Sequence, residues 1–258
     1  MESAQIQRGG KAAPLKTPTP LQRLALRQEP PGRSVMRQRW SNLLFLHWPV
    51  DPEVIRRHLP PGLQVDLFDN QAWLGVVPFA MERVHPVGLP PLPWVSWFLE
   101  LNVRTYVHDE SGRPGVWFFS LDCNQPIAVE VARRFFHLPY HHARMRAEFR
   151  NGEIIYSSRR KGSDAVSRFR YRRPVRAEPA REQSLEWFLV ERYLLFTADR
   201  TGKIRSGRVH HQPYRIEEAK CSEWSPLPIE EDGLGRLTAP PASMLVAESV
   251  DVRIFPLD

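Results

Sequence analysis

One stretch of the chain alternates polar and apolar residues so regularly that its polar side chains could together bind a small molecule. Within residues 98–107, Glu100, Asn102, Arg104 and Tyr106 alternate with Leu99, Leu101, Val103, Thr105 and Val107. A period of two predicts a β-strand with one set on each face. If the polar face lines a barrel, Glu100 and Arg104, about 13 Å apart along the backbone, could position or polarise a ligand. The competing interpretation is a solvated face with cross-strand ion pairs.

A second candidate pair, Tyr140 and His141, begins another predicted strand at residues 140–150. Tyr140 shares a face with the basic residues of that strand, whereas His141 heads the row Ala143, Met145, Ala147 and Phe149. A buried histidine with a shifted pKa suits proton transfer. The competing interpretation is a core histidine that only forms a hydrogen bond.

Other chemistries find little support in the sequence. His210 and His211 are adjacent, so in a strand they point to opposite faces and cannot easily share a metal. Ser120 lies within a predicted strand and is not part of a Gly-x-Ser-x-Gly turn. The sequence has no phosphate-binding glycine loop and no CxxC spacing. We therefore expect neither a metal nor a cofactor.

The positive charge is concentrated in two segments. The net charge of the 258 residues is +7, yet residues 1–36 carry +4 and residues 144–181 carry +8, which leaves −5 elsewhere. Within 159–173, arginines at 168, 170 and 172 alternate with Phe169 and Tyr171, which should pack inward. We expect a solvated face or an anionic-ligand contact here rather than a nucleic-acid site.

The predicted elements that position these residues are short strands. About ten strand-like runs, three short helices (near 51–59, 126–136 and 183–193) and no βαβ alternation predict an α+β, mainly antiparallel barrel. Residues 37–258 should form one domain, and the proline-rich residues 1–36 a disordered tail, with a short helix near 21–26 as an alternative. The chain has two cysteines and no apolar run long enough to span a bilayer, so we expect a cytoplasmic protein without a membrane partner.

Several blocks resemble a known family. Residues 51–63 (DPEVIRRHLPPGL) resemble a helix of the acetoacetate decarboxylase-like superfamily. More specifically, the YqjF-like family of uncharacterised proteins is matched by the blocks WLGVVPF (73–79), ELNVRTYV (100–107), GVWFFSLD (115–122), HLPY (137–140) and FLVERY (188–193). The resemblance implies an acetoacetate decarboxylase-like closed or partly closed β-barrel with a central cavity.

The residue that gives the decarboxylases their chemistry is absent. Tyr140 and His141 stand where those enzymes carry two lysines, one of which forms a Schiff base, and Glu100 falls where their strand glutamate is expected. Imine formation needs an amine, so this chemistry is not expected here.

The sequence thus predicts a barrel that binds a small molecule and acts on a carboxylate or carbonyl compound without a Schiff-base lysine. Candidate catalytic residues are Glu100, Arg104, Tyr140 and His141. The alternatives are a non-catalytic ligand-binding or sensing module, and an anionic-partner or nucleic-acid binder that uses residues 159–173. The sequence leaves the oligomeric state open, a homo-oligomer included.

Overall fold

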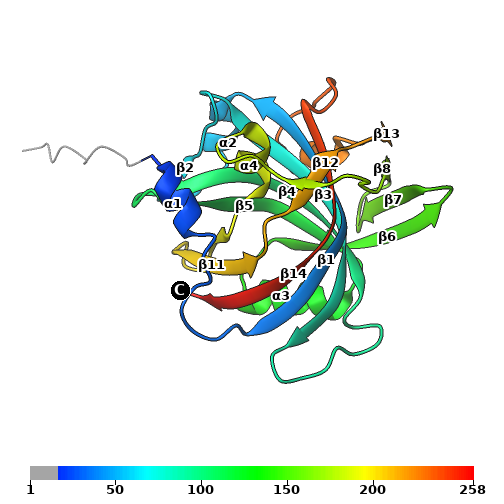
Figure 1. Ribbon diagram of the computed structural model, residues 1–258, viewed down its shortest axis with the longest axis horizontal. Helices are drawn as coiled ribbons and strands as arrows, with labels where there is room; N and C mark the ends of the chain where they lie inside the picture. Colours follow the sequence, from blue (N-terminus) through cyan, green and yellow to red (C-terminus); the bar gives the residue numbers. More distant parts are fainter. Residues whose placement is uncertain (1–16) are drawn as a thin grey trace, which may run out of the picture.

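Seven strands form a closed barrel in the structure, a computed structural model that describes residues 17–258. Neighbouring strands pair around the ring, and pairing between β4 and β5 closes it (Figure 1). All pairs are antiparallel except β5 with β10. In ring order the strands are β5 (Pro114–Cys123), β10 (Leu194–Ala198), β11 (Ile204–His211), β14 (Ser243–Leu257), β1 (Met36–Val50), β3 (Ala72–Pro86) and β4 (Phe98–Asp109).

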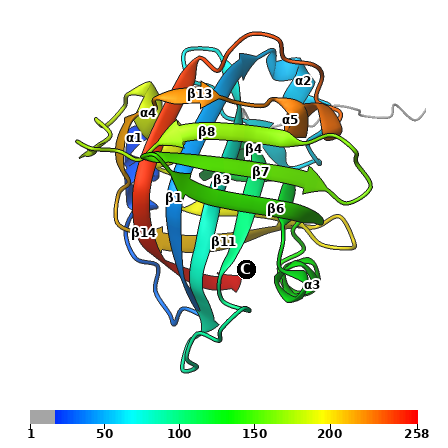
Figure 2. The same ribbon diagram turned by 90° about the vertical axis from the view of Figure 1, so that its right-hand side faces the viewer.

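A second, smaller sheet covers one side of the barrel. Its strands are β6 (Tyr140–Arg150), β7 (Glu153–Arg160), β8 (Ser167–Arg172) and β13 (Cys221–Glu223). The first residues of β6 pair in parallel with the end of β5, so this sheet continues the barrel wall and then leaves it (Figure 2). The remaining short strands are β2 (Leu63–Val65), β9 (Glu178–Pro179) and β12 (Arg215–Glu218).

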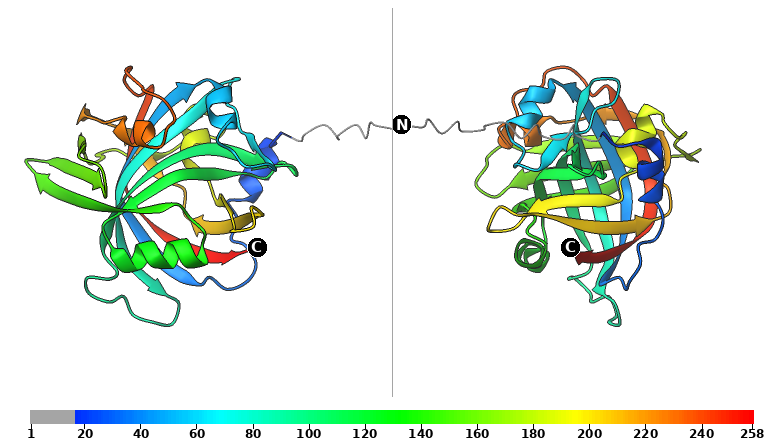
Figure 3. Two further views of the ribbon diagram at one scale, coloured as in Figure 1. Left: turned by 180° about the vertical axis from the view of Figure 1, so that it is seen from behind. Right: turned by 90° about the vertical axis from the view of Figure 1, so that its left-hand side faces the viewer.

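The described part of the chain has five short helices besides its strands. They are α1 (Pro20–Ala25), α2 (Pro52–Arg56), α3 (Pro126–Phe135), α4 (Leu185–Val190) and α5 (Leu227–Glu231). The Asp51 side chain caps α2 by accepting a hydrogen bond from the Glu53 N–H. Helices α2 and α3 begin at Pro52 and Pro126, a position at which the backbone N–H has no partner within the helix, so its loss costs nothing. Helix α3 packs against β5 and β6 at one end of the barrel (Figure 3). Among the described residues, no helix is both long and apolar enough to cross a membrane.

The barrel wall is buried on both of its faces. Inside the barrel, Phe45, Phe79 and other large side chains form one core. Outside it, Leu101 and Val103 of β4 pack with the inner face of the small sheet in a second core. Two buried faces explain why the strands hold so many large apolar residues. The expected mainly antiparallel, acetoacetate decarboxylase-like α+β barrel is confirmed.

The segment before the barrel differs from the sequence prediction. Residues 17–36 were expected to belong to a disordered tail, with a short helix near 21–26 as the alternative; that helix is present as α1, and it packs on the barrel. Arg23 forms a bidentate ion pair with Asp66 at 2.6 and 2.7 Å, and Arg208 donates to the carbonyls of Leu26 and Gln28. These long-range polar contacts hold the segment in place. Residues 1–16 of the expected tail lie outside the described residues.

Candidate functional site

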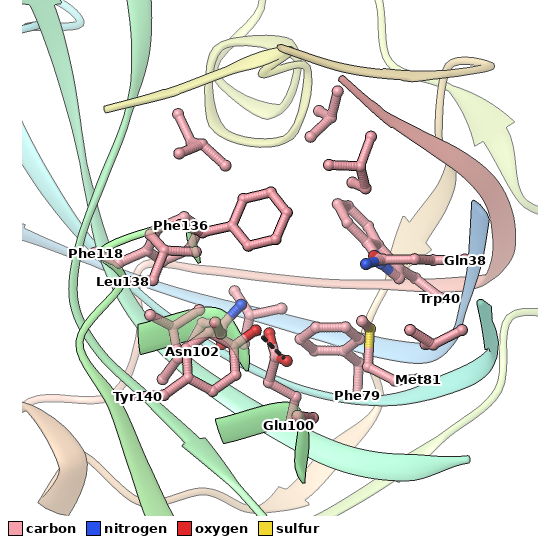
Figure 4. A pocket seen from close by; sticks show the side chains of 18 of the residues that line it. Gln38, Trp40, Phe79, Met81, Glu100, Asn102, Phe118, Phe136, Leu138 and Tyr140 are labelled. Carbon is pink, nitrogen blue, oxygen red and sulfur yellow. Dashed lines mark hydrogen bonds between the residues drawn. The ribbon is translucent and has the colours of Figure 1, made fainter. Parts of the chain in front are cut away.

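The barrel encloses a cavity of about 260 Å³ whose wall is mostly apolar (Figure 4). Side chains from β1, β3, β4, β5 and β11 line it, and α3 and the segment around Phe136 and Leu138 close one side. The polar and charged residues among those lining it are Gln38, His85, Glu100, Asn102, Arg104, Tyr140, Arg192 and Tyr214.

The polar row of β4 faces this cavity. Glu100, Asn102 and Arg104 line it, because the alternate positions Leu101 and Val103 are covered from outside by the small sheet. The alternation therefore separates two buried environments, and its polar side faces the lumen instead of solvent.

Glu100 and Tyr140 form the central polar contact of the cavity. The Tyr140 hydroxyl donates to Glu100 Oε2 at 2.7 Å, with Asn102 close by (Figure 4). Burial raises the pKa of Glu100 to about 7, although the Tyr140 hydroxyl and the Asn102 amide partly oppose the shift by favouring the charged form. Near neutral pH this carboxyl can therefore both donate and accept a proton.

Arg104 lies further along the same strand as a buried cation that has no counter-charge among the described residues. Its Nη2 donates to the Leu189 carbonyl at 3.0 Å, and its guanidinium lies 5.6 Å from the Phe45 ring centre and 5.7 Å from that of Tyr106. Within residues 17–258, the Arg104 Nε has no hydrogen-bond partner and no carboxylate pairs with the guanidinium. A buried charge is expensive unless it is paired.

A second arginine, Arg192, completes the same end of the cavity. It pairs with Asp66 at 2.7 Å, and Asp66 also holds Arg23 from α1. Burial alone would raise the pKa of Asp66, but the two arginines outweigh it and lower that pKa. Burial lowers the pKa of Arg192 to about 10, with Asp66 opposing the shift, so Arg192 stays charged at neutral pH. One carboxylate thus faces two arginines, and Arg104 adds a third positive charge nearby.

Tyr106, the fourth residue of the predicted polar row, forms hydrogen bonds next to the end of the cavity that Arg104 and Arg192 line. Its hydroxyl donates to the Leu189 carbonyl at 2.8 Å and lies 2.8 Å from His47 Nε2. Burial, and to a smaller extent Arg104, lower the pKa of His47 well below its usual value, so the ring is neutral. Being neutral, the ring does not repel the Arg104 guanidinium as an imidazolium would. Gly75 leaves room here, because a Cβ at that position would lie 3.1 Å from the His47 ring.

His141 lies outside the cavity, unlike the other three candidates. As the neighbour of Tyr140 in a strand it points to the opposite face, toward Arg160 and Asp232. There Arg160 pairs with both Asp122 and Asp232 at 2.7 Å. Burial lowers the pKa of His141 and raises that of Asp122 to about 6. The structure therefore brings together Glu100, Arg104 and Tyr140, and places His141 in a separate ionic cluster.

Sequence reasoning missed Arg192 and Asp66. Asp66 follows β2 and Arg192 follows α4, so they are 126 positions apart and no local periodicity connects them. The available signal was a charged Glu191-Arg192 pair directly after the buried apolar run Trp187–Val190. Across residues 17–258, no group of three His, Cys, Asp or Glu side chains is placed to hold a metal ion.

Comparison with solved structures identifies the class of fold. An acetoacetate decarboxylase-like enzyme from Sphingomonas wittichii RW1 superimposes with a TM-score of 0.59, over 88% of this chain and 93% of its own, at 13% identity. The enduracididine biosynthesis enzyme MppR, complexed with pyruvate, gives a TM-score of 0.56 over 88% and 91% of the two chains, at 14% identity. At such identities the likeness establishes the fold alone, which is that of the acetoacetate decarboxylase-like barrels.

Sequence comparison then identifies the family. The chain belongs to the DUF2071 family, described as an uncharacterized conserved protein, whose model matches residues 37–251. The uncharacterized protein YqjF of Bacillus subtilis (strain 168) is 37% identical over 231 residues, which cover 88% of this chain and 93% of that relative. The predicted resemblance to the YqjF-like family is thus confirmed.

Proposed function

We propose that the barrel binds a small, largely apolar carboxylate, with the ligand carboxylate at Arg104 and its hydrocarbon body along the aromatic wall. The observation that carries this proposal is the guanidinium of Arg104, which is buried in a mostly apolar cavity and pairs with no carboxylate among residues 17–258. A ligand carboxylate would supply the missing counter-charge and accept a charge-assisted hydrogen bond. The solved complex of MppR with pyruvate, a small carboxylate, is consistent with this use of the fold.

We further propose that Glu100 and Tyr140 act on a carbonyl group at the other end of the ligand. A carboxyl group with a pKa of about 7 can protonate or hydrogen-bond a carbonyl oxygen, and its conjugate base can remove a proton from the adjacent carbon. Among residues 17–258, none of those lining the cavity is a lysine. The proposed chemistry is therefore proton transfer without an imine.

Calorimetric titration with octanoate and octanamide tests the binding step. The wild type should prefer the carboxylate, and Arg104→Met should weaken octanoate binding at least about 30-fold while changing octanamide binding little. Arg144→Met, which removes an exposed arginine outside the cavity, is the matched control. Equal affinities for octanoate and octanamide in the wild type would contradict the anion site.

Deuterium exchange tests the proton-transfer step. With 6-oxoheptanoate in D₂O, proton NMR should show the wild type exchanging the hydrogens next to the ketone. Glu100→Gln should abolish exchange while leaving octanoate binding intact. Binding without exchange in the wild type would refute the catalytic role and leave a ligand-binding module, the second class that the sequence allowed.

A further inference from the structure

The outer face of the small sheet is an array of arginines. Strands β6, β7 and β8 lie side by side with this face toward the viewer in Figure 2, and cross-strand pairing of Arg144 with Arg159 and of Ser157 with Arg168 puts alternate residues of all three on one surface. We call this surface the arginine face. It contains two acidic residues, Glu148 and Glu153, and seven basic ones: Arg144, Arg146, Arg150, Arg159, Arg168, Arg170 and Arg172.

Most of this charge is not neutralised within the described residues. Glu148 pairs with Arg146 at 2.5 Å, and Glu153 lies 3.6 and 3.9 Å from Arg172 and Arg170. The other four, Arg144, Arg150, Arg159 and Arg168, have no carboxylate within ion-pair distance among residues 17–258.

Two of the four repel each other directly. Arg144 stands opposite Arg159, and like charges at such a position destabilise a strand pair. Arg160, which follows Arg159, differs from these exposed arginines. Its side chain points inward, where Asp122 and Asp232 neutralise it. The exposed arginines therefore favour an external anion.

The residue types of the arginine face indicate which kind of anion it binds. Its aromatic neighbours Phe169 and Tyr171 are buried on the opposite side, so the face offers no platform on which single-stranded bases could stack. Ile155 is the one apolar side chain that the three registers put on this face. Protein partners generally use buried apolar anchors beside their charges, and amphipathic elements that lie in a membrane interface insert apolar side chains. A regular polyanion with closely spaced phosphates needs no such anchor.

We propose that the arginine face binds the sugar–phosphate backbone of duplex nucleic acid, independently of base sequence. The array extends about 10 Å across three strands and about 20 Å along β6. Arginine is suited to this contact because its planar fork donates two hydrogen bonds to one phosphate. The 159–173 pattern alone showed only part of this surface, since β6 supplies Arg144, Arg146 and Arg150 from another part of the sequence.

Fluorescence anisotropy with a labelled 20-base-pair DNA tests the proposal. If between four and seven of these arginines contact phosphates, the slope of log K against the logarithm of the salt concentration should lie between about −3.6 and −6.3. The double variant Arg144→Gln/Arg159→Gln should weaken binding about 60-fold at 0.1 M salt and make the slope shallower by about 1.8. Its thermal midpoint should rise slightly, because the repulsive pair is gone.

A second double variant with the same change in net charge is the control. Arg181→Gln/Arg200→Gln removes two exposed arginines outside the small sheet and should leave duplex affinity within about twofold. The proposal is overturned if the wild type does not bind the duplex at 50 mM salt, if two unrelated duplex sequences differ more than about tenfold, or if the control loses as much affinity as the test variant. Binding to phosphatidylglycerol vesicles without binding to DNA would equally overturn it and assign the face to lipid. Glu100→Gln should not alter duplex binding.

Discussion

Replacing Glu100 by glutamine should change how the stability of the protein depends on pH. Burial raises the folded-state pKa of this carboxyl from 4.5 to about 7. Between these values the folded state retains a proton that the unfolded state has released, so the free energy of unfolding falls as pH rises. The stabilising contribution is fully present below pH 4.5 and is lost as pH rises through 7. A shift of this size corresponds to about 3 kcal/mol.

Glutamine mimics the protonated form and does not titrate. Glu100→Gln should therefore match the wild type near pH 4.5 and exceed it by about 3 kcal/mol at pH 8. Urea denaturation at half-unit steps from pH 4.5 to 8.5 measures both curves, and other titrating groups such as Asp122 cancel in the difference. A difference that stays constant within about 0.5 kcal/mol, less than a fifth of the predicted change, would refute the raised pKa.

Tyr140→Phe is the matched control for this experiment. It removes the hydrogen bond that favours the charged form of Glu100, so the pKa of Glu100 should rise further. The fall in stability should then move to higher pH. A shift to lower pH would contradict the assigned role of the hydroxyl.

Three further substitutions test the surrounding structure. Arg104→Met should raise the calorimetric melting temperature of the ligand-free protein, because it removes an unpaired buried charge, and a lower one would contradict this. Arg23→Gln should cost about 1–2 kcal/mol in urea at pH 7, since Asp66 keeps its other partner. That loss should shrink as pH falls through the lowered folded-state pKa of Asp66, where the carboxyl takes up a proton; an unchanged loss would refute the pairing. Gly115→Ala should lower the free energy of unfolding by about 2–3 kcal/mol in the same assay, because its Cβ would lie 2.7 Å from the Leu194 carbonyl oxygen. An unchanged free energy of unfolding would show that the barrel wall moves to accommodate the extra methyl group.

Local patterns were sufficient where neighbouring residues decide the structure. The alternation at 98–107 predicted both the strand and the division of its residues between two faces, and β4 spans Phe98–Asp109. The Asp-Pro-Glu start correctly predicted helix α2, although the helix ends at Arg56, before the expected Leu59. The arginines of β8 are exposed and its aromatic residues buried, as the period of two predicted.

Local patterns failed where distant residues supply the partner. Residues 17–36 were predicted as part of a tail because the segment is rich in proline and lacks apolar periodicity, and nothing near Arg23 in the sequence indicates its ion pair with Asp66. Tyr140 and His141 are adjacent in sequence but enter different environments, because β6 separates the barrel cavity from the Arg160 cluster. An apolar row can face either a core or a lumen, and periodicity alone does not distinguish the two.

The sequence by itself determined the class of fold, the family, and the candidate row Glu100–Arg104, because these depend on residue order and on a period of two. Tertiary structure decided which face of that row is the lumen, since the small sheet covers the other face. It also decided the charge state of the site. Burial brings the pKa of Glu100 to about 7, and the absence of a carboxylate beside Arg104 among the described residues leaves a cation for a ligand to neutralise. Both effects depend on desolvation and on contacts between distant segments, which residue order does not specify.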